Sequence, residues 1–453
     1  MLRSSNTLAQ PYQPILDYQK QVVTAPPSTM VTNRELFILG IWIASFTVGL
    51  DVFFELKLYD IVGVIAIWHF RSQVWRGFRE RSRVGSIFRW LVVVFVVGFL
   101  VSIVRVGEPF FIAVTSLRLV RLFLYFSIFL VIRAIPFDVI RLRILIWVFT
   151  ISCLGQAILI FLQEQGVVPI FWSLKEVAIY GRLYSTGTLG LNHINQVLYM
   201  SLGICAALSL TIIKRKWIIL HIAFVGFACT LMVYAILVGE ARSGLVALAV
   251  ILMILAIQFR KIIALILIIP LFVLIDASLG LENQAKVAKM WDKDVIQKSA
   301  PGLSGVDAIE ALDAPRPKIW GDSLLRLSED PTFLLIGAGF QNYKGLGARG
   351  AAAGHNMYLH VLVELGIVGL FIYIAFLLFL FKYIKRRKNE CNESIRIKIF
   401  GIVFFGVLLV LGLFNESLYP QRAIMGFMGF ALAYLAVVGH HAWSVRPYLV
   451  NSE

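Results

Sequence analysis

The stretch that decides the fold class lies at residues 367–381 and reads IVGLFIYIAFLLFLF. It carries almost no polar atom, and apolar runs of similar length recur along the 453 residues of the chain. A helix of about 20 such residues crosses the roughly 30 Å hydrocarbon core of a bilayer. Because 59% of the residues are hydrophobic and only 15% are charged, a soluble fold could not bury this much apolar surface. The sequence therefore predicts an all-α, polytopic membrane protein.

The number and orientation of the spans follow from the charges of their connections. Twelve spans are expected, near residues 34–51, 53–70, 87–104, 111–132, 139–162, 189–212, 217–238, 243–258, 262–279, 355–381, 397–415 and 422–440. Connections 71–89, 133–143, 213–217, 259–261 and 382–398 together hold 21 of the 42 Lys and Arg residues. Since basic connections stay in the cytoplasm, both termini are predicted to be cytoplasmic. Charged residues between positions 51 and 60 interrupt the first two predicted spans. A total of eleven spans is therefore the alternative.

Several classes of partner are excluded by the composition and by missing motifs. The net charge of +16 gathers in the connections of one side, so it indicates orientation and attraction to anionic membrane lipid, not binding of nucleic acid. The outward connections contain no clustered His and carboxylate ligands, so no catalytic metal is required. The chain also has no Walker loop and no dinucleotide-binding glycine motif, so no nucleotide cofactor is expected.

The predicted organisation contains one large hydrophilic segment. A cytoplasmic segment at 1–33 precedes nine spans within 34–279, a large outward loop at 280–354, three spans within 355–440 and a cytoplasmic tail at 441–453. Residues 318–327 of the loop predict an amphipathic helix, with Ile319, Trp320, Leu324, Leu325 and Leu327 on its apolar face. A loop of this length is predicted to form a small ordered subdomain, and such loops usually carry function.

Three arginines fall on the outward side of this topology. Arg242 stands between two apolar spans, where a guanidinium is costly unless an anion satisfies it. Its planar fork suits a phosphate, although a salt bridge to Glu240 or an interfacial, snorkelling position is the alternative. Arg182 precedes small and hydroxyl residues that would let backbone N–H groups approach an anion, and a plain Gly- and Ser-rich loop is its alternative. Arg316 is either a third phosphate ligand or a solvated loop charge.

A histidine at the mouth of a long apolar helix is the candidate for proton transfer. His355 and Asn356 stand immediately before that helix. His355 is either a general base or a helix cap without catalytic function, and His193 at the mouth of another span is the competing base. His360 and Glu364 are expected to orient neighbouring groups.

These residues together suggest a substrate class. Arginines would neutralise a diphosphate while the histidine takes a proton from an attacking hydroxyl. Because the outer side of a bacterial membrane has no ATP, the energy must arrive with the substrate. A polyprenyl-diphosphate-linked sugar meets this need, and its lipid tail explains an active site inside a membrane bundle.

Four short motifs resemble the O-antigen ligase/polymerase superfamily over roughly residues 181–380. The most specific reads His355-Asn356-Met357-Tyr358-Leu359, followed by Glu364-Leu365-Gly366 and Gly369-Leu370. The other three are the block Arg316…Trp320…Pro331…Gly337-Ala338-Gly339, the element Ala241-Arg242-Ser243-Gly244, and the element Arg182…Gly187…Asn192…Asn195. The last element departs from the expected Asn-Pro-Asn by reading Leu-Asn-His-Ile-Asn.

The resemblance implies a metal-independent, inverting glycosyltransferase of the GT-C-like membrane type in the bacterial inner membrane. Its donor would be an undecaprenyl-diphosphate-linked glycan, and its active site would face the periplasm. By this analogy His355 activates the acceptor hydroxyl, while Arg182, Arg242 and Arg316 hold the diphosphate. Supporting roles fall to Asn356, Glu364 and His193.

The motifs leave the acceptor open. Ligation of O-antigen to lipid A-core is named first, and polymerisation of lipid-linked repeat units is the alternative. A protein O-glycosyltransferase and a non-enzymatic transporter or flippase are further alternatives. A transporter would need charges near the bilayer midplane, where Arg118 and Arg121 of the fourth span either line a polar groove or face another helix.

Overall fold

The computed structural model describes residues 31–48, 51–53, 56–79, 83–135, 139–171, 185–189, 193–210, 218–239, 244, 246–251, 315–342, 356–385, 406–407 and 409. Four helices in these ranges are long and apolar enough to cross a membrane, namely Gly85–Val106, Pro109–Ile132, Arg143–Glu164 and Met357–Phe379. Shorter apolar helices cover Leu58–His69, Gln196–Leu208 and Ile222–Val238. The predicted class, a helical multi-pass membrane protein, is confirmed. Twelve spans remain a prediction, because 262–279 and 422–440 lie outside the described residues.

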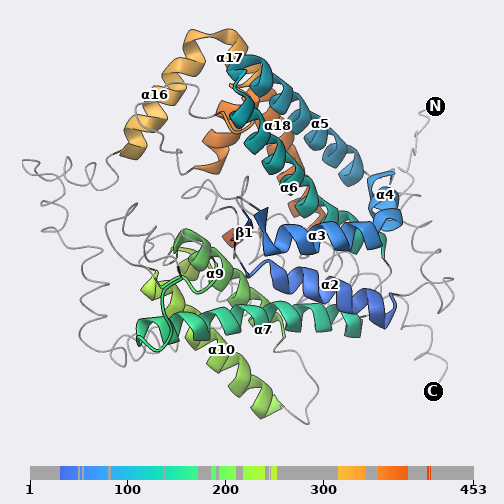
Figure 1. The fold of residues 1–453 in the computed structure, drawn as a ribbon, viewed down its shortest axis with the longest axis vertical. Coiled ribbons are helices and arrows are strands. Elements are labelled where there is room, and N and C mark those ends of the chain that lie inside the picture. Colours follow the sequence, from blue (N-terminus) through green and yellow to red (C-terminus); the bar gives the residue numbers. More distant parts are fainter. Residues whose placement is uncertain are drawn as a thin grey trace, which may run out of the picture.

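The helices form two groups joined by a pair of short helices (Figure 1). One group contains α5 (Arg83–Val106), α6 (Pro109–Ala134) and α18 (Met357–Lys385). The other contains α7 (Val139–Glu164), α9 (His193–Ser209) and α10 (Ile218–Val238), which pack against one another. Between them lie α2 (Asn33–Ser45), which packs on α7, and α3 (Leu58–His69), which packs on α6.

The two joining helices are shorter than predicted. Helix α2 has 13 residues and α3 has 12, so each is about 20 Å long and too short to cross the bilayer alone. An antiparallel hairpin of β1 (Asp51–Phe53) and β2 (Leu56–Lys57) lies between them. The predicted spans 34–51 and 53–70 therefore each contain only a short helix, and the charged residues that interrupt them begin and end a hairpin.

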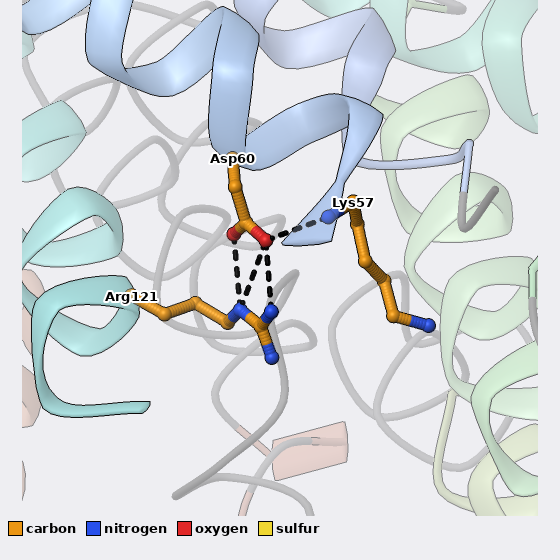
Figure 2. A network of polar contacts seen from close by, with 3 residues as sticks. All are labelled: Lys57, Asp60 and Arg121. Atoms are coloured by element: carbon orange, nitrogen blue, oxygen red, sulfur yellow. Dashed lines mark hydrogen bonds and ion pairs between the residues drawn. The ribbon is translucent and has the colours of Figure 1, made fainter. Parts of the chain in front are cut away.

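A buried ion pair fixes the start of α3 against α6 (Figure 2). Arg121 Nη2 lies 2.8 Å from Asp60 Oδ2, and Arg121 Nε donates to both carboxylate oxygens at 3.0 and 3.1 Å. The backbone N–H of Lys57 donates to Asp60 Oδ2 at 3.0 Å. Arg121 lies near the middle of α6, so the hairpin end is level with the middle of a candidate span. Chain reversal at that depth requires pairing of its polar groups within the protein.

The end of α3 and helix α4 (Arg71–Arg79) carry exposed tryptophans with arginines stacked on them. Arg71 lies 5.2 Å from the ring centroid of Trp68, and Arg79 lies 4.4 Å from that of Trp75. Trp90, near the start of α5, is also exposed. Trp is enriched at both interfaces of a membrane, and Arg in the connections on its cytoplasmic side. This arrangement favours the predicted orientation.

An aromatic core holds α5, α6 and α18 together. Phe88 of α5 contacts Phe126 of α6 edge to face, with ring centroids 5.1 Å apart, and Phe376 of α18 at 6.4 Å. Two turns further along α5, Phe95 meets Phe340 edge to face at 5.9 Å. All these rings are buried, so the segment around Phe340 belongs to the core.

Residues 315–342 form two helices and a return segment at the end of α5 and α18 (Figure 1). Helix α16 (Pro315–Glu329) confirms the amphipathic helix predicted at 318–327, and α17 (Pro331–Ile336) follows it. Leu327 is buried against α18 residues, with Trp320 packed beside it. Leu324 and Leu325 of the predicted apolar face are instead exposed, at 50% and 60%. Only the part of the face that reaches α18 is therefore covered.

Candidate functional site

Asn356 caps the N-terminus of α18. Its Oδ1 accepts hydrogen bonds from the backbone N–H groups of Tyr358, at 3.0 Å, and Leu359, at 3.1 Å. Its own carbonyl accepts from His360 N at 2.9 Å. Asparagine is among the best N-caps, because its side chain satisfies donors that have no partner within the helix. The helix-cap role that the sequence left open for His355 is thus played by its neighbour.

Helix α18 is broken nine residues after its start. Gly366 has φ 69° and ψ −174°, which divides the helix into residues 357–365 and 367–385. The carbonyls of Val363 and Glu364, next to the break, accept from Ala338 N at 2.7 Å and Gly339 N at 3.0 Å. A glycine is required at 366, because its φ is positive and a side chain would collide with the carbonyl of Leu335. The Glu-Leu-Gly motif therefore marks a helix break that a second segment caps.

That second segment, the return segment at residues 337–342, is packed between α5 and α18. Its N–H groups bond in turn to Phe333 O, Val363 O, Glu364 O, Gly98 O, Glu364 Oε2 and Gly339 O. Gly339 has φ 105°, and a Cβ there would lie 2.6 Å from Ser102 Cα. Non-helical backbone beside membrane helices is tolerated when its polar groups are satisfied by protein. The Gly-x-Gly motif provides this close approach.

Glu364 is the polar centre of this contact. Its side chain is 1% exposed, and its Oε2 accepts from Gln341 N at 2.6 Å. Its Oε1 lies 2.6 Å from His360 Nε2, an ion-pair distance without the alignment of a ring N–H hydrogen bond. Gln341 in turn accepts from Arg118 Nη1 at 2.6 Å through its Oε1. Arg118 and Arg121 of α6 therefore both face other elements of the protein, Gln341 and Asp60 respectively.

The start of α17 is attached to the end of α5. Asp330 caps α17 by accepting from Thr332 N and Thr332 Oγ1, both at 2.8 Å. The Arg105 guanidinium lies 3.9 Å from the ring centroid of Phe333 and donates to Thr332 Oγ1 at 3.4 Å. The two hydrogen bonds from Thr332, aided by the charge of Arg105, lower the pKa of Asp330.

The described part of the Arg182 element, residues 185–189, lies on α7. Gly187 N donates to Gln163 Oε1 at 2.8 Å, and Thr188 N donates to Gln156 Oε1 at 2.9 Å. Leu189 N donates to the Thr186 carbonyl at 3.1 Å. The expectation that these N–H groups approach an anion is therefore wrong for residues 187–189, because protein acceptors already occupy them. An anion bound here would have to use groups other than the N–H groups of residues 187–189.

The predicted site residues fall into three sets, according to how far the structure describes them. Asn356, which caps α18, and Glu364, which lies in its first half, are both described. Arg316 lies in the first turn of α16 and His193 begins α9, and only the backbone of each is described. His355, Arg182 and Arg242 lie outside the described residues.

Sequence reasoning missed Gln341, the partner of Arg118. Gln341 lies in a glycine-rich turn, and no local pattern distinguishes it from its neighbours. One signal was present: an arginine inside an apolar span needs a polar partner. Another was the Gly-x-Gly pair, which indicates a close backbone approach.

Comparison with known families matches the O-antigen ligase family at residues 227–374, about a third of the chain. No match was found among the curated proteins. The matched region contains α17, the return segment, Asn356, the break at Gly366 and Glu364. This match supports membership of the O-antigen ligase/polymerase superfamily, in agreement with the motifs of the sequence.

Proposed function

We propose that this protein transfers an undecaprenyl-diphosphate-linked glycan to an acceptor hydroxyl at the periplasmic face of the inner membrane. The favoured reaction is ligation of O-antigen to lipid A-core. The observation that carries the proposal is the O-antigen ligase match over residues 227–374, which includes the capped and broken helix α18.

In the proposed reaction the acceptor oxygen attacks the anomeric carbon of the donor sugar. His355 takes the proton of the attacking hydroxyl as general base. The bond between the sugar and the diphosphate breaks, and undecaprenyl diphosphate leaves with the bonding electrons. Attack from the face opposite the leaving group inverts the anomeric configuration. Asn356 supports this role by fixing the start of the helix that follows His355.

Arg182, Arg242 and Arg316 are proposed to hold the diphosphate and stabilise the charge that develops on it. Both roles follow from the chemistry of the guanidinium group. It stays charged, and it binds two phosphate oxygens at once. Arg242→Ala should abolish activity, and Arg242→Lys should lose most of it although the positive charge is kept. His193 and Glu364 are proposed as supporting residues.

The test is complementation of a deletion strain, with analysis of lipopolysaccharide and lipid-linked glycans on gels. His355→Ala is expected to accumulate long undecaprenyl-linked chains that are not attached to lipid A-core. His69→Ala, which changes the histidine at the last residue of α3, is the matched control and should restore ligation. Wild-type transfer by His355→Ala, at equal expression, would contradict the assignment of the base.

The same gels decide between ligase and polymerase. A single repeat unit still attached to the core would mean that the protein polymerises repeat units. Purified protein should keep its activity in EDTA, and a loss reversed by magnesium or manganese would contradict the metal-independent mechanism.

A further inference from the structure

The first half of α18 needs support that the rest of the helix does not give. Residues 357–365 form only nine residues of helix before the break at Gly366. A helix this short is not stable by itself, because helix nucleation is costly and few hydrogen bonds repay it. Its placement must therefore come from contacts with other elements.

A polar chain from α6 reaches this half-helix through the return segment. Arg118 Nη1 donates to Gln341 Oε1 at 2.6 Å, and Gln341 N donates to Glu364 Oε2 at 2.6 Å. Glu364 Oε1 lies 2.6 Å from His360 Nε2. His360 N then closes the first turn of the helix by donating to the carbonyl of Asn356. We name these residues, Arg118, Gln341, Glu364 and His360, the α6–α18 relay.

Gln341 is held in an unusual conformation to make this connection. Its φ is 62°, and it is the non-glycine residue with positive φ among the described residues. This conformation costs energy for a side chain that is neither glycine nor asparagine. In return, the backbone N–H of Gln341 reaches Glu364 while its side chain reaches Arg118. Strain at this position is thus coupled to a contact between two membrane helices.

The charged side chains of Arg118 and Glu364 are not needed for apolar packing between the helices. Arg118 lies within a candidate span, and Glu364 is 1% exposed, so each is costly there unless it is bonded. A structure that needed only stability would be served as well by apolar residues of similar volume. Polar, directional bonds instead fix one arrangement of the half-helix relative to α6.

We propose that Arg118 is a positioning residue, which acts through Gln341 and Glu364 to hold the capped half-helix of α18 in the arrangement used for glycan transfer. This inference rests on the proposed function, because the transfer reaction is what the arrangement serves. It assigns no contact between Arg118 and substrate.

The experiment compares three variants of the purified full chain in nanodiscs. Arg118→Ala removes the start of the relay, and Arg118→Lys keeps one donor for Gln341 Oε1. The matched control is the double variant Asp60→Asn/Arg121→Met, which removes a buried arginine and its partner charge one turn further along α6. Transfer is measured with lipid-linked glycan extracted from a deletion strain and with lipid A-core, and deuterium uptake is measured for residues 356–365.

Arg118→Ala is expected to lower kcat on the order of 100-fold, the effect of displacing a reacting group by about 1 Å, with the KM for the donor unchanged. Deuterium uptake should rise at residues 356–365 and stay unchanged at 367–379. Arg118→Lys should restore most of kcat, in contrast to Arg242→Lys. The control should keep kcat within a few-fold of wild type.

Three results would overturn the inference: an unchanged kcat in Arg118→Ala, a rise in KM alone, or unaltered protection of residues 356–365. Failure of the proposed function is distinguishable, because the wild-type protein itself would then transfer no glycan. In that case the deuterium measurement still reports whether Arg118 holds the half-helix.

Discussion

At the residue scale, Asn356 is a residue of the family motif whose contribution to stability can be measured. It supplies two hydrogen bonds to the first turn of α18. We expect Asn356→Ala to destabilise this turn by about 1 kcal/mol, the usual cost of losing an N-cap. Asn356→Asp or Asn356→Ser, which keep an oxygen acceptor, should recover most of this loss in thermal unfolding. If Asp and Ser behave like Ala, the side chain acts by some means other than capping.

Asp330 gives a prediction for the effect of pH at the same scale. Because its folded pKa is lowered, its charged form stabilises α17 fully above the ordinary carboxyl pKa of about 3.9. The stabilisation is lost as pH falls through the lower folded value. Deuterium uptake of α17 should therefore rise below about pH 4. Asp330→Asn keeps the capping oxygen without the charge, so its uptake should show no such acid step; an identical step would point to another group.

At the element scale, the contact between the return segment and α5 depends on a glycine. A side chain at Gly339 would meet the backbone of Ser102, and the φ of 105° disfavours any residue but glycine. We expect Gly339→Ala to abolish folding or lower the unfolding temperature strongly. Gly226→Ala, on a face of α10 with no atom within 4 Å of the added Cβ, is the control and should be neutral. Equal stability of the two variants in detergent would contradict the close packing.

The predictability of the elements differs for a physical reason. Helices α5, α6, α7 and α10 and the start of α18 agree closely with the spans expected from apolar length, which is a local property. The two short helices at the start of the described chain do not. Their apolar segments are long enough to cross the membrane twice, but Asp60 forms an ion pair with Arg121 of α6. This partner is 61 residues away in the sequence, so no local window contains the contact that fixes the start of α3.

At the scale of the whole molecule, the ion pair of Asp60 and Arg121 attaches the joining helices to α6. Removing one partner would leave a buried charge, which costs about 3–5 kcal/mol. Asp60→Asn and Arg121→Met should each lower the unfolding temperature, whereas the double variant should be closer to wild type. A double variant as unstable as the sum of the two singles would show that the two side chains do not interact.

The orientation of the bundle can be tested with a membrane-impermeant maleimide on spheroplasts. Ser328→Cys in α16 and Ser72→Cys in α4 place exposed thiols at opposite ends, in a background with Cys391→Ala. We expect labelling of position 328 in intact spheroplasts, and of position 72 only after permeabilisation. The reverse pattern would invert the topology and place the proposed site in the cytoplasm.

The sequence by itself predicted the membrane class, the position of most helices, the orientation and the resemblance to the superfamily. These follow from apolar length, from the side on which basic residues gather and from short motifs, all of which are local in the chain. Only the tertiary structure decided that α18 is broken at Gly366 and capped by the return segment. It also decided that Arg118 bonds to Gln341, 223 residues away. Such contacts depend on which segments meet in space, because a buried polar group takes whatever partner the packed bundle brings within reach.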